Sequence, residues 1–198
     1  MTSNCYIVVD EGSKHCICID PSSEKSEREI AYIEQHGLSL DYIILTHEHT
    51  DHTWGVNSLV DRFHPQVICS ETCKQNLGME FQAYFQLYFD DTEYTYNVCK
   101  VDKTTEELGR QLEWQGYKIA FIPTPGHSMG SVCILIDGKL FTGVTIMQST
   151  PYVNRRNGSK EKFKESVIKI QGLFDERQEI YPGHGDAFRL KDYYSQTR

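Results

Sequence analysis

Three histidines and an aspartate crowd into one short segment of the chain, directly after an apolar run. Residues 42–45 read Tyr-Ile-Ile-Leu, and residues 46–52 read Thr-His-Glu-His-Thr-Asp-His. The apolar run has the character of a buried strand, and a helix is expected from residue 54, so the polar segment occupies a loop that a rigid scaffold holds. Neutral imidazole nitrogens and carboxylate oxygens are the usual ligands of zinc and related ions. The segment therefore predicts a metal centre that uses His47, His49, Asp51 and His52.

The spacing of these four side chains favours two neighbouring ions over one. Four donors on so short a loop do not all reach a single ion comfortably, whereas two adjacent ions can share them. The pair His47-Glu48 also resembles the start of the H-E-x-x-H motif, in which both histidines lie on one helix. That motif is excluded because position 51 is aspartate and the segment lacks a long helical context.

Two further histidines lie in turns rich in glycine and proline that follow predicted strands. Residues 124–128 read Thr-Pro-Gly-His-Ser, and residues 181–185 read Tyr-Pro-Gly-His-Gly. Glycine permits a sharp turn and a close approach of the backbone, while proline stiffens the approach. Side chains presented with so little conformational freedom suit metal ligation. His127 and His184 therefore join the candidate ligands.

Together these motifs resemble those of the metallo-β-lactamase superfamily. Residues 46–52 are similar to its H-x-H-x-D-H signature, the two glycine-proline turns are similar to its later ligand motifs, and the strand pair that ends at residues 19–21 resembles its opening. The similarity runs over residues 4–186. It implies an α/β fold, a four-layer αβ/βα sandwich with the metals at one edge, in one domain over residues 1–198.

The resemblance also implies a division of the ligands between two sites. The first metal would be held by His47, His49 and His127. The second metal would be held by Asp51, His52 and His184. Asp51 would in addition act as a catalytic residue, because it would orient the attacking water. Zinc, as one or two ions, is the expected cofactor, with iron or manganese as alternatives.

One departure from the family pattern concerns the carboxylate that bridges the two ions. Many relatives carry Gly-Asp at the position where this chain reads Gly143-Val144. Three interpretations stay open: two ions joined by hydroxide alone, as in one subclass of the β-lactamases; a weak second site in an enzyme that works with one ion; or a site that no longer catalyses. The replacement argues against the iron-dependent persulfide dioxygenases of the family, whose single iron uses that aspartate as a ligand.

Hydrolysis of a carbonyl-centred bond by a metal-bound hydroxide is the chemistry expected of such a centre. Zinc lowers the pKa of a bound water from about 15.7 to about 7, so hydroxide is present at neutral pH. The glyoxalase II-like thioesterases are the relatives named first, and a thioester, lactone or ester of small size is the expected substrate. The alternative, motivated by Val144, is a catalytically silent metal-binding or regulatory protein.

Charge and cysteine content restrict the partners and the compartment. Twenty Lys and Arg against 28 Asp and Glu give a formal charge of −8, which disfavours a nucleic-acid partner. The seven cysteines include no C-x-x-C pair and are predicted to be reduced core thiols. No apolar run approaches the ~20 residues that span a bilayer, and the first residues do not resemble a signal peptide. A cytoplasmic protein without a membrane partner is expected, and its oligomeric state is left open.

Short apolar runs alternate with helical patterns along the chain, as in an α/β protein. Strands are predicted over residues 5–9, 15–20, 42–45, 67–69, 117–122, 132–136, 140–142 and 179–181. Helices are predicted over residues 23–36, 54–63, 70–78 and 160–174. The aromatic stretch 79–101 has two interpretations: a helix that packs its aromatic face on the core, or a cap over a substrate cleft.

Other polar residues near these motifs have structural interpretations. Three histidines are expected to be structural or solvated rather than ligands: His15, His36 and His64. Thr46 and Ser131 are expected either to bond to ligand imidazoles or to serve turns. A predicted substrate-facing loop carries Tyr152, Arg155 and Arg156, with solvated loop charge as the alternative.

Overall fold

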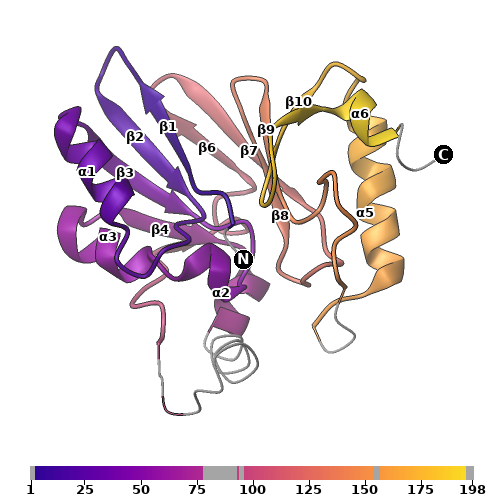
Figure 1. Cartoon of the computed structure of the whole chain (residues 1–198), viewed down its shortest axis with the longest axis horizontal. Coiled ribbons are helices and arrows are strands. Elements are labelled where there is room, and N and C mark those ends of the chain that lie inside the picture. The colour runs from indigo at the N-terminus through magenta and orange to yellow at the C-terminus, as the bar shows by residue number, and fades with distance from the viewer. Residues whose placement is uncertain (1–2, 78–92, 94–95, 154–156, 195–198) are drawn as a thin grey trace.

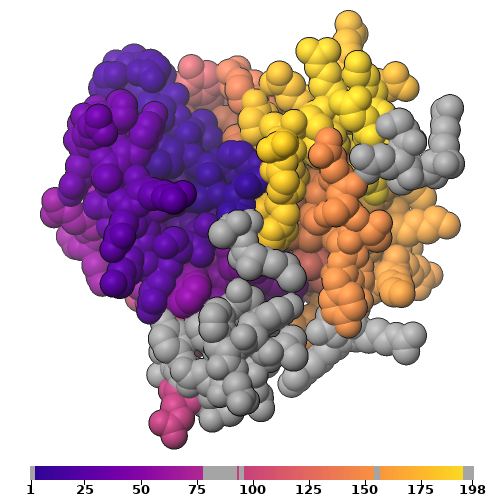
Figure 2. Space-filling model, viewed as in Figure 1, coloured from indigo at the N-terminus to yellow at the C-terminus, as the bar shows by residue number. Residues whose placement is uncertain are grey.

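The strands are divided between two sheets that face each other (Figure 1). The computed structural model describes residues 3–77, 93, 96–153 and 157–194. The first sheet consists of β1 (Tyr6–Asp10), β2 (His15–Ile19), β3 (Ser39–Ile44), β4 (Gln66–Cys69) and β5 (Lys103–Thr104). The second sheet consists of β6 (Gln111–Trp114), β7 (Tyr117–Pro123), β8 (Val132–Ile136), β9 (Lys139–Gly143), β10 (Glu179–Pro182) and β11 (Phe188–Arg189). The indigo and magenta first half of the chain meets the orange and yellow second half along a seam (Figure 2).

Strand direction brings several strand ends to one edge of the sandwich. In the first sheet, ordered β1-β2-β3-β4-β5, strands β2 to β5 pair in parallel and β1 pairs antiparallel with β2. In the second sheet, ordered β11-β10-β9-β8-β7-β6, β9 and β10 pair in parallel and the other pairs are antiparallel. Two antiparallel steps separate β7 from β9, so β7, β9 and β10 run the same way. The loops after these strands therefore leave from one edge.

Helices cover the outer face of each sheet (Figure 1). The helices of the described residues are α1 (Glu27–Gln35), α2 (Thr50–Thr53), α3 (Val56–Phe63), α5 (Lys160–Leu173) and α6 (Leu190–Tyr194), and residues 71–77 are also helical. The short α2 lies at the edge of the sandwich instead. Helices α1 and α3 pack on the first sheet and α5 packs on the second. The layers run helix, sheet, sheet, helix, with one apolar cluster at each of the three boundaries.

Alternation along β2 shows how one strand serves two of these clusters. Cys16 and Cys18 pack under α1 and α3 with Ile33, whereas Ile17 and Ile19 pack between the two sheets. Successive side chains of a strand point to opposite faces of its sheet, so a strand covered on both faces is apolar throughout. This requirement explains why the sequence of β2 has no alternation of apolar and polar residues.

The predicted strands and helices are confirmed in type and order within the described residues, with differences at their ends. The helix predicted from residue 23 begins only at Glu27, because the buried Ser26 has a left-handed φ of 44°. The helix predicted over residues 54–63 is α3, and a separate short helix, α2, precedes it. The predicted turn at Asp137-Gly138 has φ of 48° and 73°, as a two-residue hairpin of type I′ requires.

Five short elements are absent from the sequence-based prediction: α2, β5, β6, β11 and α6. β5 and β11 have two residues each, too few for any periodicity to appear. Most of the aromatic stretch 79–101 lies outside the described residues. Both interpretations of it, a helix packed on the core and a cap over a substrate cleft, therefore stay predictions. Within it, Tyr96 is described, and its hydroxyl accepts a hydrogen bond from the Asn57 amide at 3.2 Å.

All seven cysteines are free thiols. The prediction of core thiols is confirmed for the five that are buried, which are Cys16, Cys18, Cys69, Cys73 and Cys133. It is wrong for Cys99, which is exposed because it lies in a connecting segment without regular structure, and Cys5 is only partly buried. Within the described ranges, no helix combines the length and the apolar character that crossing a membrane requires.

Candidate metal centre

The carboxyl end of β3 leads directly into the histidine-rich segment. His47 and His52 are almost completely buried, with 1% and 0% of their surface exposed. His49 has an extended backbone, with φ of −65° and ψ of 144°, and α2 begins at the next residue. One turn of helix then carries Asp51 and His52. The loop therefore presents four candidate ligands from a buried backbone that is held by β3 on one side and α2 on the other.

The turn after β7 supplies His127. Gly126 has a φ of 149°, and a Cβ at this position would lie 2.2 Å from the Cα of Phe163 in α5, so only glycine fits. The Nδ1 of His127 contacts the carbonyl oxygen of Tyr152 at 2.9 Å and must donate to it. In the neutral ring the lone pair is then on Nε2, which lies 2.9 Å from Nδ1 of His49.

The turn after β10 supplies His184. A Cβ on Gly183 would lie 2.7 Å from Cε1 of His52 and 2.9 Å from the carbonyl oxygen of Gly143, so this turn packs directly on the other ligand loop. The Gly183 amide donates to the Gly143 carbonyl at 2.6 Å. The Asn4 amide in turn donates to the Gly183 carbonyl at 2.7 Å. Glycine is therefore required here by close approach.

The six predicted ligands come together as two groups of three. Within each group, one nitrogen or oxygen atom from every residue lies within 4.8 Å of the other two. The first group, called here the histidine trio, consists of His47, His49 and His127. The second, called here the mixed trio, consists of Asp51, His52 and His184. These are the two sets that the resemblance to the family implies.

The donor atoms of the mixed trio form a nearly equilateral triangle. Nε2 of His184 lies 3.4 Å from Oδ2 of Asp51 and 3.4 Å from Nε2 of His52. Nε2 of His52 lies 3.7 Å from Oδ2 of Asp51. Ligands bound at about 2.0–2.1 Å to a tetrahedral zinc ion lie roughly 3.3–3.4 Å apart. The three atoms therefore fit one face of a zinc tetrahedron.

A buried nitrogen without a partner marks the histidine trio. Nδ1 of His47 contacts the hydroxyl of Thr46 at 2.9 Å, whereas its Nε2 is buried and makes no hydrogen bond within the described part of the chain. The ring of His47 lies 4.7 Å from that of His49 and 5.1 Å from that of His127, between centroids. An unpaired buried polar atom is unfavourable, and a cation bound by the three imidazoles would satisfy it. The residues present therefore fit a metal ion.

One buried carboxylate orients an imidazole in each trio. Oδ1 of Asp20 accepts a hydrogen bond from the Thr46 amide at 2.8 Å, and Oδ2 accepts from the Thr46 hydroxyl at 2.6 Å. Because that hydroxyl donates to Asp20, it accepts from Nδ1 of His47. Oδ2 of Asp20 also contacts Nδ1 of His52 at 2.9 Å. Asp20 lies within ligand distance of both rings. Its oxygens already accept the hydrogen bonds just described, so we assign it to orienting the rings and not to binding metal. These bonds fix the tautomers of His47 and His52 and turn Nε2 of each ring toward its trio.

The environment keeps most of these imidazoles neutral. Burial, reinforced by the neighbouring imidazoles, lowers the pKa of His47 and of His49 well below 6.5. Burial also lowers the pKa of His127 to about 4. At His52 burial acts in the same direction, but the charge and hydrogen bond of Asp20 outweigh it and raise the pKa. Neutral imidazole is the form that binds metal, so the histidine trio is prepared for a cation near pH 7.

The bridging position of the family is apolar in the structure. Val144 directly follows β9 and is 6% exposed. The preceding Gly143 has a φ of 50°, and a Cβ there would lie 2.5 Å from the Thr46 hydroxyl oxygen, so β9 ends against the ligand loop. Val144 offers no oxygen at this place, and among the described residues Asp51 is the carboxylate of the mixed trio.

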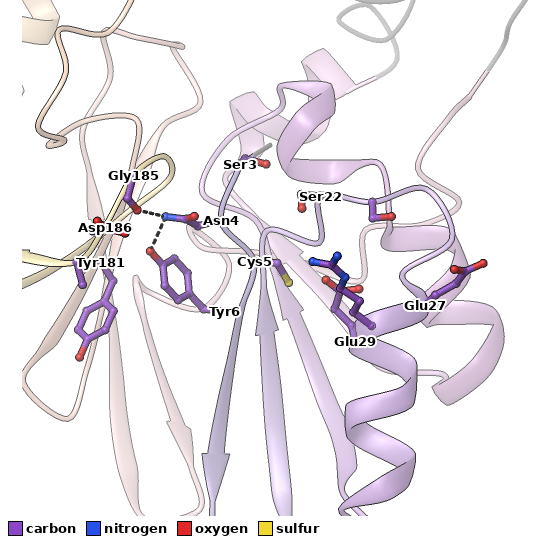
Figure 3. Close-up of a pocket in the computed structure, with 13 residues that line it drawn as sticks. Ser3, Asn4, Cys5, Tyr6, Ser22, Glu27, Glu29, Tyr181, Gly185 and Asp186 are labelled. Atoms are coloured by element: carbon purple, nitrogen blue, oxygen red, sulfur yellow. Dashed lines mark hydrogen bonds between the residues drawn. The ribbon is translucent and has the colours of Figure 1, made fainter. Parts of the chain in front are cut away.

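A cavity of about 690 Å³ is lined by the N-terminal segment and by the turn after β10 (Figure 3). Nδ2 of Asn4 donates to the Gly185 carbonyl at 2.6 Å, and the hydroxyl of Ser3 donates to the Asp51 carbonyl. The N-terminal segment therefore connects the two loops that carry the mixed trio, and Gly185, next to His184, lines the cavity.

The ligand set predicted from the sequence omits two buried carboxylates that support it, Asp20 and Glu48. Asp20 stands at the end of an apolar strand, and Glu48 stands between two ligands with none of its surface exposed. A charged residue inside a buried segment is the signal that marks both positions. Thr46 makes the predicted hydrogen bond to an imidazole. Ser131 instead stabilises the turn in which it lies, because its hydroxyl accepts a hydrogen bond from the Ser128 amide at 3.3 Å.

The three histidines that were expected to be structural or solvated lie outside both trios. His15 contacts Asp41 at 2.7 Å, and His36 contacts the Tyr32 carbonyl at 2.8 Å. His64 ends α3 with a left-handed backbone. The side chain of Tyr152 is 80% exposed, while positions 155 and 156 lie outside the described residues.

Comparison with known proteins gives the family. The family model described as the metallo-beta-lactamase superfamily matches residues 1–184. A protein of Bacillus velezensis named "Probable polyketide biosynthesis zinc-dependent hydrolase" is 27% identical over 93% of this chain and 74% of its own length. A hydroxyacylglutathione hydrolase of Photobacterium profundum is 28% identical over 89% of this chain, which spans 60% of that protein.

Solved structures agree on the fold. The crystal structure of the B3 metallo-beta-lactamase BLEG-1 has a TM-score of 0.80 at 22% identity and covers 98% of this chain and 91% of its own. A protein crystallised in a di-iron-bound form has a TM-score of 0.82 at 20% identity and covers 97% of this chain and 92% of its own. The four-layer sandwich predicted from the sequence motifs is therefore confirmed.

Replacement of Asp20 tests whether one carboxylate orients both trios. Asp20→Asn is expected to weaken zinc binding by about 10–100-fold, the usual effect of losing an outer partner of a ligand. Asparagine tolerates the left-handed φ of 52° at this position, so the backbone is kept. Zinc affinity is measured by competition with a chelating dye, and Glu34→Gln on the exposed side of α1 is the control. An Asp20→Asn protein that is folded and binds zinc as tightly as the parent contradicts this role.

The lowered imidazole pKa values predict how the stability of the metal-free chain depends on pH. Unfolded histidine takes up a proton near pH 6.5, whereas folded His127 does so only near pH 4. The unfolded state therefore binds more protons between these values, and the free energy of unfolding falls as pH is lowered from 6.5 to 4. His52, with its raised pKa, contributes a stabilisation that is lost as pH rises above 6.5 and is already complete below that value.

Urea denaturation in the presence of a chelator, repeated between pH 7 and pH 4.5, measures this slope. His127→Gln is expected to make it shallower, because one group with a lowered pKa is removed. His36→Gln removes a histidine that lies outside both trios and is expected to keep the slope of the parent. Equal slopes in the parent and in His127→Gln contradict the prediction.

Proposed function

This chain belongs to the metallo-β-lactamase superfamily, and from that premise we propose that it is a metal-dependent hydrolase of a carbonyl-centred bond. The observation that carries the proposal is the convergence of six donor side chains as two adjacent trios. His47, His49 and His127 would hold the first ion. Asp51, His52 and His184 would hold the second. Members of the family in the comparison include hydrolases of thioesters and β-lactams by name, which supports a hydrolytic reaction.

Zinc is the metal we propose first. Five imidazoles and one carboxylate form a donor set that suits zinc, and a relative is named as zinc-dependent. Iron is the alternative, because a structural neighbour was solved with two iron ions. When bound, such ions supply Lewis acidity, which lowers the pKa of a water molecule and polarises a carbonyl oxygen.

The residues of the chain position the reactants around that chemistry. Oδ2 of Asp51 faces His184 and His52, which leaves the other carboxylate oxygen to accept a hydrogen bond from the attacking water and orient it. Asp20 acts through the ligands and does not contact the reactants: its hydrogen bonds hold the rings of His47 and His52 in one tautomer each. Rings that are already oriented before substrate arrives need no reorganisation during the reaction.

We propose a small-molecule substrate, with thioesters, lactones and esters as the first classes to test. The names of the relatives support an acyl substrate, since hydroxyacylglutathione is a thioester. The formal charge of −8 disfavours a nucleic acid. The seven unpaired cysteines support a reducing compartment such as the cytoplasm.

A catalytically silent metal-binding or regulatory protein is the second candidate, and Val144 is the observation that favours it. Without a bridging carboxylate, less negative charge offsets the repulsion between two ions at these trios, so the second ion to bind is expected to bind more weakly than the first. A chain that kept one ion but lost the second would keep the fold and the ligands without efficient turnover.

Metal analysis combined with a substrate panel separates the two functions. Protein purified without chelator is expected to contain zinc and to hydrolyse members of a thioester, lactone and ester panel. His127→Ala is expected to lower kcat/KM by more than about 100-fold, because even an outer partner of a ligand contributes 10–100-fold. Metal without turnover on the whole panel favours the silent protein, and wild-type rates in His127→Ala contradict the ligand assignment.

Restoring the carboxylate at position 144 tests the role of the missing bridge. Val144→Asp is expected to tighten the second ion, because an added anion between two cations lowers their repulsion. Calorimetric zinc titration of the parent and the variant measures the stoichiometry and both affinities. Val144→Ala is the control for loss of the apolar side chain. Equal second-ion affinity in Val144→Asp and the parent contradicts the expectation.

A further inference from the structure

The side chain of Glu48 turns away from the two trios although both of its neighbours in the sequence are ligands. It is completely buried. Oε2 accepts a hydrogen bond from the Ser128 hydroxyl at 2.5 Å, and Oε1 accepts from Nδ2 of Asn76 at 3.0 Å. Both side-chain oxygens accept hydrogen bonds, and these bonds compensate their removal from water. An apolar residue of similar size would fill the space but would make neither bond.

These two bonds connect the separate segments that carry the histidine trio. Glu48 lies between His47 and His49, and Ser128 is the residue directly after His127. The Glu48–Ser128 bond therefore joins the two ligand loops one residue away from the ligands on each side. Asn76 belongs to helical residues 71–77, so the same carboxylate is also anchored to the outer helix layer.

The loop of His127 is held to the same place by its own hydrogen bonds. The Ser128 hydroxyl accepts from the Gly130 amide at 3.0 Å, and the Gly130 carbonyl accepts from the Ser70 hydroxyl at 2.7 Å. A Cβ on Gly130 would lie 2.6 Å from Oε2 of Glu48 and 2.6 Å from the Cys73 amide. The loop is therefore packed against the carboxylate with no room for a side chain.

We propose that Glu48 is a positioning residue whose carboxylate holds the loop of His47 and His49 and the loop of His127 at the separation that metal binding requires. The contact between His49 and His127, 2.9 Å between ring nitrogens, is the distance that this arrangement fixes. The proposal rests on the proposed metal site. It extends that site to a residue that binds no metal and contacts no substrate.

Metal titration of single-site protein tests the proposal without measuring turnover. His184→Ala removes one member of the mixed trio and leaves the histidine trio intact. In this background the visible absorption of cobalt(II) reports the geometry of the site, and competition with a chelating dye reports zinc affinity. Circular dichroism and the melting temperature report folding of every variant.

Glu48→Ala and Ser128→Ala are each expected to weaken zinc binding by about 10–100-fold and to change the cobalt spectrum. The double variant Glu48→Ala/Ser128→Ala is expected to bind zinc as tightly as the single variant with the lower affinity, because both substitutions remove the same connection between the loops. Glu48→Gln retains one acceptor oxygen and is expected to recover part of the affinity. If Glu48→Ala does not fold, Ser128→Ala and Glu48→Gln carry the same test.

Asp41→Ala is the matched control for a purely structural effect. The Asp41 carboxylate also accepts from two side chains, Nε1 of Trp114 at 2.8 Å and Nδ1 of His15 at 2.7 Å, but it touches no ligand loop. The Asp41→Ala substitution is expected to lower the melting temperature and to leave zinc affinity unchanged. The proposal is overturned if folded Glu48→Ala and Ser128→Ala bind zinc as the background does, or if Asp41→Ala weakens binding equally. No zinc binding by the His184→Ala background overturns the histidine trio itself, and with it the proposed function.

Discussion

Hydrogen bonds to one buried carboxylate, Asp20, fix the geometry on which both trios depend. Three donors from the histidine-rich loop converge on its two oxygens: the amide and hydroxyl of Thr46 and the ring of His52. A buried carboxylate without such partners would be strongly unfavourable, so the loop and the carboxylate stabilise each other. Through Thr46 the same group orients His47. One interaction at the end of β2 therefore determines which ring nitrogens face each trio.

The strand arrangement explains why residues so distant in sequence meet at this place. β2 and β3 are parallel neighbours, with Ile19 opposite Ile44, so Asp20 and the histidine-rich loop leave the first sheet together. In the second sheet β9 and β10 are parallel neighbours and the loops after them touch through Gly143 and Gly183. The apolar cluster between the sheets holds these two edges against each other. The centre is thus assembled from strand ends, which are the most rigid positions that a loop can start from.

The grouping of the six candidate ligands was predictable from the sequence because each has a local signal. The crowding of residues 47–52 and the glycine-proline turns before His127 and His184 are visible without any structure. The buried strands were predictable for the same reason, since apolar runs are local. The roles of Asp20 and Glu48 were not, because their partners lie 26 and 80 residues away and only folding brings them together. The two-residue strands β5 and β11 depend on pairing with neighbours and have no pattern of their own.

The central claim is that the two trios bind metal ions, and anomalous X-ray diffraction tests it most directly. Crystals of protein purified without chelator are measured on both sides of the zinc absorption edge. The account predicts an anomalous peak within bonding distance of His47, His49 and His127, and a second, of equal or lower occupancy, at Asp51, His52 and His184. Iron in place of zinc at these positions would change the metal but keep the site. The account would be contradicted if zinc-soaked crystals showed no anomalous density at either trio. It would also be contradicted if the imidazoles of His47, His49 and His127 pointed to no common centre.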